Sequence, residues 1–399
     1  MQKLLIVSHE KHLLCLEYTD NRLSGIRIIN DTSGSLLGNV YVGRVSKMMA
    51  NLHACFVDIS RDLTGFLPLS NVVNPILANR VYDGTIKQGD IIVVQIEKDA
   101  VKTKQPVLKT NISISGLYVI METTEGSIGI SNKLDKKCKD DILSYLVENK
   151  MINPDKKILD GEEHSLPFSA IIRTNAGNPA NYEALKSEWN YLKDTLKNIT
   201  EYGLHQSIFT CLYKASEPII ECLKNYYQEC YEEIITDIPE IYEKLQNTEK
   251  VKIPVRLYRD EYALKKLYNV ESEIERALQS RIWLKSGAYL ILEYTEALTV
   301  IDVNSGKKQA SKENQQNFFE INMEAAHEIM FQLKLRNISG MILIDFINME
   351  NDAQYLELMN LLRELAKKDS VKTDVIDLTK LGLVEMTRKR IGRPIKELL

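Results

Sequence analysis

Two apolar stretches, LTVIDVN at residues 298–304 and MILIDFI at residues 341–347, predict neighbouring strands of one sheet. Between them, residues 313–336 carry apolar side chains at steps of three and four, the period of a helix with one buried face. A strand, a crossover helix and a second strand most simply form a βαβ unit, so the two strands are expected to be parallel. The nearly continuous apolar run of the second strand is typical of a strand covered on both faces.

Each of these two strands holds a single carboxylate, Asp302 in the first and Asp345 in the second. Burying a carboxylate without a partner is costly, so each is expected to be hydrogen-bonded, paired or bound to a metal ion. Both lie toward the carboxyl ends of their strands, where open α/β sheets place ligands. Asn304 follows Asp302 by two residues and therefore projects from the same face of the strand.

A set of aspartate and asparagine oxygens suits Mg²⁺, with Mn²⁺ as the alternative. A metal ion held there can polarise a phosphodiester and activate water. The opposing interpretation is that each aspartate only caps a neighbouring turn, and the spacing alone leaves both interpretations open.

Residues 38–109 contain several short strand patterns separated by turn residues, which predicts a small barrel. Phe56 and Phe66 each flank a strand end, and Lys104 lies in a lysine-rich loop nearby. Aromatic side chains that stack on bases, together with lysines that neutralise phosphates, are typical of an OB-fold that binds single strands. The alternative is that both phenylalanines belong to the barrel core.

The remaining patterns are less specific. The first thirty residues predict two or three antiparallel strands, and residues 112–173 show further strand patterns. A helix is expected over residues 182–198 and another over residues 271–280, while residues 207–246 look largely helical.

The 399 residues, of which 44% are apolar and 27% charged, are ordinary for a folded protein of several domains. No apolar run approaches the ~20 residues of a membrane helix, and the N-terminal apolar run is too short for a signal peptide. The six cysteines form no CxxC pair, which argues against a zinc site and a disulfide framework. A cytoplasmic protein without membrane association is therefore expected.

The formal net charge is −4, so any binding to a polyanion must come from local patches. Residues 380–396 hold six basic residues against one acidic residue. This segment is a candidate contact for a nucleic-acid backbone, and a solvated basic face is the alternative.

Taken together, these residues resemble the ribonuclease E/G family of bacterial endoribonucleases, and the resemblance runs over nearly the whole chain. Its strongest stretches are GNVYVGRV (38–45), CFVDIS (55–60), GFLPLS (65–70), IIRTNAG (171–177), TEALTVIDVNSGK (295–307), NMEAAHEIMFQLKLRNISGMILIDFI (322–347) and LGLVEMTRKR (381–390).

The resemblance implies an α/β fold of mixed α+β type built from four parts. These are an RNase H-like domain (residues 1–37 and 213–280), an inserted OB-fold RNA-binding domain (38–110), a 5′-sensor subdomain (111–212) and a DNase I-like catalytic subdomain (281–399).

It also implies roles for particular residues. Asp302 and Asp345 hold a catalytic Mg²⁺, and Asn304 orients the second aspartate. Phe56, Phe66 and Lys104 hold RNA next to the cut. A pocket that prefers a 5′-monophosphate is formed by Arg173, Thr174, Gly116 and Ile120.

The sequence departs from the family pattern in three places. The arginines usual near Asn132 and Lys380 are absent, which weakens the expectation of 5′-end sensing. Asn348 stands where the family motif usually ends in Asp. The sequence ends at Leu399, where the family usually continues into a CPxC zinc-link and a small domain. No zinc is therefore expected, a zinc-linked tetramer is not supported, and the oligomeric state is left open.

The leading hypothesis is a Mg²⁺-dependent endoribonuclease that cuts single-stranded RNA, leaving a 5′-phosphate and a 3′-hydroxyl, in RNA processing or decay. The alternative from another class is a non-catalytic RNA-binding protein of the same fold. A nuclease acting on DNA is a third hypothesis, resting only on fold analogy.

Overall fold

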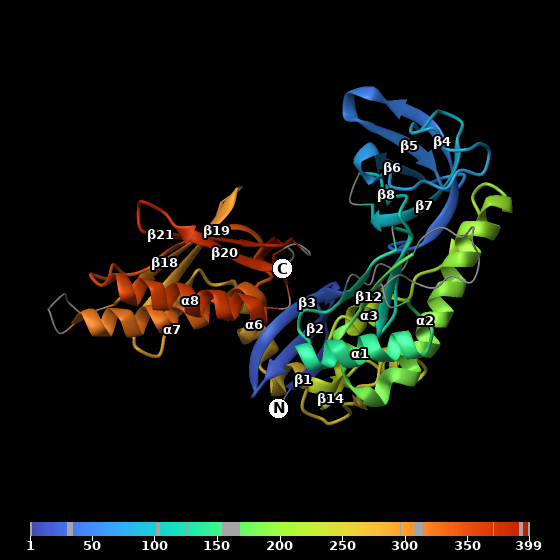
Figure 1. The fold of residues 1–399 in the computed structure, drawn as a ribbon. Helices are drawn as coiled ribbons and strands as arrows, with labels where there is room; N and C mark the ends of the chain where they lie inside the picture. Colours follow the sequence, from blue (N-terminus) through green and yellow to red (C-terminus); the bar gives the residue numbers. More distant parts are fainter. Residues whose placement is uncertain are drawn as a thin grey trace. The chain divides into compact units, whose positions relative to one another are not determined.

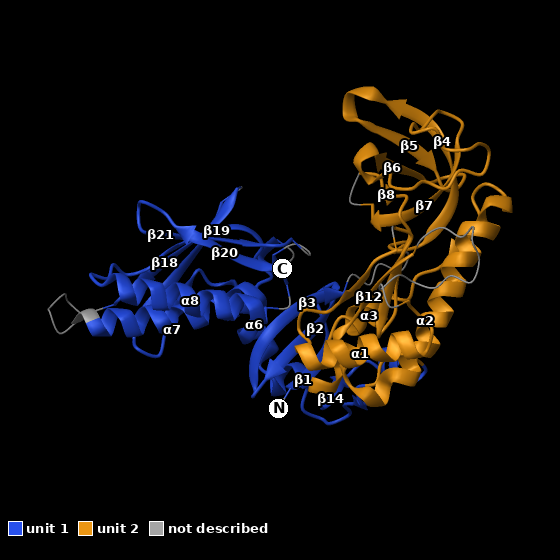
Figure 2. Ribbon diagram, in the orientation of Figure 1, with its two compact units in different colours: residues 1–29, 231–247, 253–399 blue, residues 30–230, 248–252 orange. Residues whose placement is uncertain are grey.

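The structure, a computed structural model, describes residues 2–29, 35–100, 104–124, 126–153, 168–295, 297–306, 314–369, 371–390 and 394–397. The chain is of mixed α/β type and divides into two compact units, shown in Figure 2. Unit 1 comprises residues 1–29, 231–247 and 253–399, and unit 2 comprises residues 30–230 and 248–252.

The described residues form eight α-helices: α1 (Lys136–Glu148), α2 (Tyr182–Lys197), α3 (Pro218–Lys224), α4 (Pro239–Gln246), α5 (Leu264–Leu267), α6 (Val270–Leu278), α7 (Asn314–Leu335) and α8 (Asp352–Lys368). Among the described residues, none of these helices is both long and apolar enough to cross a lipid bilayer.

The first sheet of unit 1 has five strands in the order β15-β14-β1-β2-β3. They are β1 (Gln2–His9), β2 (His12–Thr19), β3 (Arg22–Ile29), β14 (Glu233–Thr236) and β15 (Val255–Leu257). The antiparallel meander β1–β2–β3 confirms the prediction for the N-terminus. β14 joins β1 in parallel, and β15 joins β14 in parallel.

The second sheet of unit 1 has six strands in the order β16-β17-β18-β19-β21-β20. They are β16 (Arg281–Trp283), β17 (Tyr289–Tyr294), β18 (Leu298–Asn304), β19 (Gly340–Asp345), β20 (Thr373–Leu378) and β21 (Leu383–Arg388). β18 and β19 pair in parallel with α7 as the crossover, which confirms the predicted βαβ unit.

Helices α7 and α8 lie side by side along one face of this sheet (Figure 1). Alternate strand residues, such as Ile342 and Ile344, are buried against them in one apolar core. The other face carries exposed side chains, among them Met341, so the expectation that this strand is covered on both faces was wrong. Its apolar run reflects one buried face and a second, open face with its own apolar side chains.

Unit 2 contains the predicted barrel. Its strands are β4 (Val40–Met49), β5 (Ala54–Asp58), β6 (Thr64–Pro68), β7 (Ile91–Lys98) and β8 (Val107–Lys109). They pair in the order β4-β5-β6-β8-β7, and β7 pairs again with β4 to close the ring, as expected for an OB-like barrel. A short strand, β13 (Cys211–Tyr213), adds to β4 from outside the ring.

The second sheet of unit 2 has the order β11-β12-β10-β9. These strands are β9 (Ser113–Ser115), β10 (Val119–Glu122), β11 (Ile128–Ile130) and β12 (Ser169–Ile172). The predicted helix over residues 182–198 is α2, whose apolar side chains pack in the core of this part. The interpretation of residues 207–246 as largely helical was wrong, because this region also contributes strands β13 and β14.

The basic segment of residues 380–396 is partly a structural element rather than a solvated face. Arg388 lies in β21 and donates hydrogen bonds to Asp369 at 2.7 and 3.2 Å and to the carbonyl of Ile338 at 2.8 Å. The Arg388 and Asp369 side chains are 2% and 3% exposed. Lys389 and Arg390 are exposed, and residues 391–393 lie outside the described residues.

We predict that Asp369→Asn lowers the free energy of unfolding by roughly 3–5 kcal/mol at pH 7, because it leaves the Arg388 charge buried without its partner. Burial tends to raise the pKa of Asp369, but the hydrogen bonds and charge of Arg388 outweigh it and hold that pKa below its usual value. The stabilisation is therefore present above about pH 4 and is lost as the pH falls through the lowered pKa. Urea denaturation should show a smaller difference in the free energy of unfolding between Asp369→Asn and the unaltered protein at pH 3 than at pH 7.

Asp374→Asn is the matched control, because the Asp374–Lys372 pair is 3.6 Å long and solvent-exposed. Its removal should change the free energy of unfolding by less than ~1 kcal/mol. The prediction would be contradicted if the two variants lost the same free energy of unfolding. It would also be contradicted if the loss in Asp369→Asn were the same at both pH values.

Candidate active site

The two predicted aspartates lie side by side in the six-stranded sheet. Asp302 of β18 and Asp345 of β19 are direct register partners in the parallel pair. Neighbouring strands are about 4.8 Å apart, and paired residues direct their side chains to the same face. This is the open face, opposite α7 and α8, where Asp302 is half-buried and Asp345 is exposed.

Asn304 holds the first aspartate in place. Its Nδ2 donates a hydrogen bond of 2.6 Å to Oδ2 of Asp302. The resemblance implied that Asn304 orients Asp345, whereas the contact observed here is with Asp302. In this structure the amide therefore positions the nearer carboxylate, and its proposed role toward Asp345 stays a prediction.

A buried asparagine that the sequence analysis missed supports the segment after Asp345. Asn322 of α7 donates from Nδ2 to the carbonyl of Ile347 at 2.8 Å and accepts from the Ile347 amide at 3.0 Å. The Tyr355 hydroxyl accepts a further bond from the Met349 amide at 3.1 Å. The signal in the sequence was a polar residue on the buried face of α7, where an amide is retained only if its hydrogen bonds are satisfied.

The donor set fits a hard divalent cation. Asp302 and Asp345 supply carboxylate oxygens on one face of the sheet, with access to solvent. Within the part of the chain that the structure describes, no group of three or more His, Cys, Asp or Glu side chains is arranged to hold a metal ion. Mg²⁺ commonly binds through one or two carboxylates and keeps several waters, so two aspartates suffice for it.

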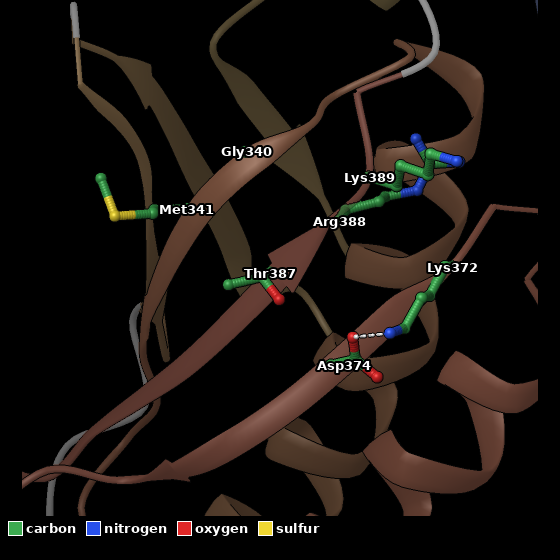
Figure 3. A pocket seen from close by; sticks show the side chains of 7 residues that line it. All are labelled: Gly340, Met341, Lys372, Asp374, Thr387, Arg388 and Lys389. Carbon is green, nitrogen blue, oxygen red and sulfur yellow. Dashed lines mark ion pairs between the residues drawn. The ribbon is translucent and has the colours of Figure 1, made fainter. Parts of the chain in front are cut away.

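A hollow of about 320 Å³ lies elsewhere on the same sheet (Figure 3). It is lined by Gly340, Met341, Lys372, Asp374, Thr387, Arg388 and Lys389. Gly340 begins β19, whereas Asp345 ends it. Because a strand rises ~3.3 Å per residue, this hollow is well separated from the aspartates.

The barrel phenylalanines form a pair on its outer surface. Phe56 of β5 and Phe66 of β6 are register partners, and their ring centroids are 5.8 Å apart at 62°. Both are half-buried, whereas Cys55 and Val57 beside Phe56 are fully buried in the barrel core. The alternative that both phenylalanines are core residues was therefore wrong.

Exposed lysines accompany this pair. Lys104 is exposed in the segment that leads to β8. Lys47 of β4, which the sequence analysis missed, is exposed and is the register partner of Phe56. A row of lysine and two aromatic rings thus crosses three strands of the barrel.

Arg173 directly follows β12 and is tied to backbone carbonyls. Its Nη1 donates to Gly116 at 2.8 Å, and its Nη2 donates to the carbonyl of Lys224 at 2.7 Å and to Oδ1 of Asn225 at 2.8 Å. Burial lowers the pKa of this guanidinium, and the charge of Glu188 acts in the opposite direction. Arg173 and Gly116, predicted from distant parts of the sequence, are thus brought into contact.

The other predicted residues of this pocket lie nearby in sequence or in the sheet. The Thr174 hydroxyl is 2.9 Å from that of Ser131. Ile120 is half-buried in β10, in register with Ser115 and Ile171.

Glu188 of α2, which the sequence analysis also missed, fixes the loop beside Gly116. Its carboxylate accepts hydrogen bonds from the amides of Leu117, Tyr118 and Val119 at 2.7, 2.7 and 3.1 Å. A Cβ atom on Gly116 would collide with this carboxylate. The glycine is therefore required for close approach of a charged side chain.

The predicted residues thus fall into groups within separate units. Asp302, Asp345 and Asn304 belong to unit 1, and the barrel and Arg173 groups belong to unit 2.

Comparison with known proteins shows the family to which the chain belongs. Residues 113–391 match the model of the ribonuclease E/G family. Ribonuclease G of Escherichia coli (strain K12) is 31% identical over 392 residues, which covers 94% of this chain and 77% of that protein. Ribonuclease E of Synechocystis sp. is 29% identical over 408 residues, covering 98% of this chain and 58% of that protein. Because the family match spans well over half of the sequence, the chain belongs to the ribonuclease E/G family of enzymes.

Proposed function

We propose that the protein is a Mg²⁺-dependent endoribonuclease that hydrolyses single-stranded RNA, leaving 5′-phosphate and 3′-hydroxyl ends. Membership of the ribonuclease E/G family supports the substrate class. The observation that carries the proposal is the register pairing of Asp302 with Asp345 on the open face of the sheet.

In this proposal, Asp302 and Asp345 hold the metal ion, and the hydrogen bond from Asn304 keeps the Asp302 carboxylate in one orientation. When bound, Mg²⁺ supplies positive charge against the scissile phosphate and makes water a better nucleophile at neutral pH. Asn322 fixes the backbone after Asp345, so that both carboxylates stand on rigid supports.

Unit 2 is proposed to bind the RNA strand. Phe56 and Phe66 offer exposed ring surface for stacking of bases, and Lys104 and Lys47 offer positive charge for the backbone. This arrangement binds without reading base edges, which suits an enzyme acting on many sequences.

Arg173, Thr174, Gly116 and Ile120 are proposed to bind a 5′-terminal phosphate. A guanidinium has five N–H donors, and the three bonds of Arg173 to oxygen atoms of the protein leave two for a ligand. Those three bonds also hold the side chain in place, which lowers the entropy lost on binding.

We also propose the four-part division made from the sequence. The order β3-β2-β1-β14-β15, with three antiparallel strands followed by two parallel ones, supports an RNase H-like domain from residues 1–37 and 213–280. The barrel falls within residues 38–110, the sheet of β9 to β12 within residues 111–212, and the sheet of β16 to β21 within residues 281–399.

Asp302→Asn and Asp345→Asn should each lower the rate of RNA cleavage by at least ~10³-fold, because each removes one of two charged ligands. Binding of single-stranded RNA in EDTA should persist, since the barrel is unchanged. The measurements are cleavage of a labelled AU-rich oligonucleotide with Mg²⁺ and its binding without Mg²⁺.

Asp374→Asn, which removes an exposed carboxylate from the same sheet, is the control and should cleave normally. Normal cleavage by either active-site variant would refute the assignment of the site. RNA binding by the unaltered protein without any cleavage in Mg²⁺ would instead favour a non-catalytic RNA-binding protein.

The 5′-phosphate pocket is tested by one RNA prepared with either a 5′-monophosphate or a 5′-hydroxyl. The unaltered protein should cleave the monophosphorylated strand faster, because Arg173 binds the terminal phosphate with charge-assisted hydrogen bonds. Arg173→Lys and Thr174→Val should bring the ratio of the two rates toward one, while cleavage of the 5′-hydroxyl strand stays similar. Equal rates on the two substrates for the unaltered protein would rule out 5′-end sensing.

A further inference from the structure

An aromatic pair, exposed Trp283 and half-buried Tyr289, lies on the β16–β17 hairpin outside the sites described above. The Trp283 side chain is 64% exposed, and its ring centroid lies 5.2 Å from that of Tyr289 at 58°. The Arg281 guanidinium lies 4.8 Å from the Tyr289 ring centroid and 6.0 Å from that of Trp283. A solvent-exposed aromatic ring next to a cationic side chain is typical of a site that stacks on a nucleobase.

Sheet register places this group on the same face as the two aspartates. Arg281 pairs with Ile291, Ile291 with Asp302, and Asp302 with Asp345, so one row crosses four strands. The next row contains Trp283, Tyr289 and Asn304. With strands about 4.8 Å apart, Tyr289 is the direct neighbour of Asn304, and the aromatic pair borders the carboxylate site.

The hairpin that carries the aromatic pair is fixed to the rest of unit 1. Glu324 of α7 accepts hydrogen bonds from the amides of Lys285 and Ser286 in its turn, at 2.7 and 3.3 Å. Gly306 has φ +71°, and a Cβ atom there would lie 2.6 Å from the Gly287 carbonyl oxygen. The turn therefore packs directly on the segment that follows Asn304, and the aromatic pair is held in place before any ligand arrives.

We propose that Trp283, Tyr289 and Arg281, here called the hairpin platform, bind a nucleobase of single-stranded RNA adjacent to the phosphate that is cut. The proposal rests on the function proposed above, in which Asp302 and Asp345 form the catalytic site. A base stacked on the platform fixes the backbone beside Asn304, so the platform aligns the scissile phosphate with the carboxylates. It differs from the barrel pair Phe56 and Phe66 in lying within the same unit as the aspartates.

RNA is favoured over a protein partner by the charges around the platform. Arg281 is exposed and covers the rings with a cation, and Lys285 is exposed in the turn. Carboxylates that suit a divalent cation complete the same face. RNA, a polyanion that binds divalent cations, would pair with Arg281 and also supply a metal ion to the aspartates. An apolar protein surface would leave Arg281 and the aspartates without partners.

Intrinsic fluorescence gives a direct test, because the chain has two tryptophans and the other, Trp189, is 1% exposed. A single-stranded RNA oligonucleotide titrated in EDTA should quench the emission of Trp283. Trp283→Phe should remove the quenching and keep the RNA affinity within about two-fold, since the ring is retained. Trp283→Ala should weaken binding and lower kcat/KM by about ten-fold.

Tyr262→Ala removes a similarly exposed ring elsewhere in unit 1 and is the control, with no expected change in RNA affinity or kcat/KM. Trp283→Ala with unchanged RNA affinity and unchanged kcat/KM would overturn the proposal. A change in sedimentation mass on Trp283→Ala, with RNA binding intact, would also overturn it in favour of a protein interface. Asp302→Asn is measured in parallel. If this variant cleaves RNA at the normal rate, the proposed function has failed. If it loses cleavage but the Trp283 variants leave RNA affinity and kcat/KM unchanged, only the proposal for the hairpin platform has failed.

Discussion

The parallel pairing of β18 with β19 is the constraint on which the rest of the candidate site depends. Burial of alternate residues such as Ile342 and Ile344 under α7 and α8 fixes which side chains face away from the helices. Because strand side chains alternate with a period of two, a slip of one residue would turn Asp345 into the apolar core. The same apolar packing that stabilises unit 1 therefore also sets Asp302 beside Asp345.

Helix α7 does more than cover the sheet. Its buried Asn322 holds the backbone after Asp345, and its Glu324 holds the turn that carries the hairpin platform. The hydrogen bonds of both side chains go to main-chain groups, so they fix the path of the chain whatever side chains stand there. Two loops around the carboxylates are thus held by one element whose own position is set by hydrophobic burial.

The parts that sequence reasoning predicted correctly are those with strong local periodicity. β18, α7, β19 and four of the five barrel strands follow from spacing, whereas β8 lies at the end of a segment that reads as a lysine-rich loop. The parallel pairing of the strands that hold Asp302 and Asp345 follows from the crossover rule. Helix α1 was missed because only Ile142 and Leu146 of its side chains are buried, which leaves almost no apolar period.

Other features could not be read from spacing because they depend on partners distant in sequence. β14 is a strand only because β1 and β15 flank it, although its surroundings look helical. The basic run around Arg388 is typical of surface charge, and only its ion pair with Asp369, distant in sequence, accounts for its burial. The sequence around Trp283 does not show that this side chain lies near the aspartates, because its position on the sheet depends on register with Tyr289 and Asn304.

The position of Asn322 within α7 has a consequence for how this family can change during evolution. An α-helix turns by about 100° for each residue, so one residue inserted in α7 after Asn322 would swing that amide away from Ile347 without altering any catalytic side chain. The number of residues between Asn322 and Ile347 is thus constrained by the two hydrogen bonds that join them.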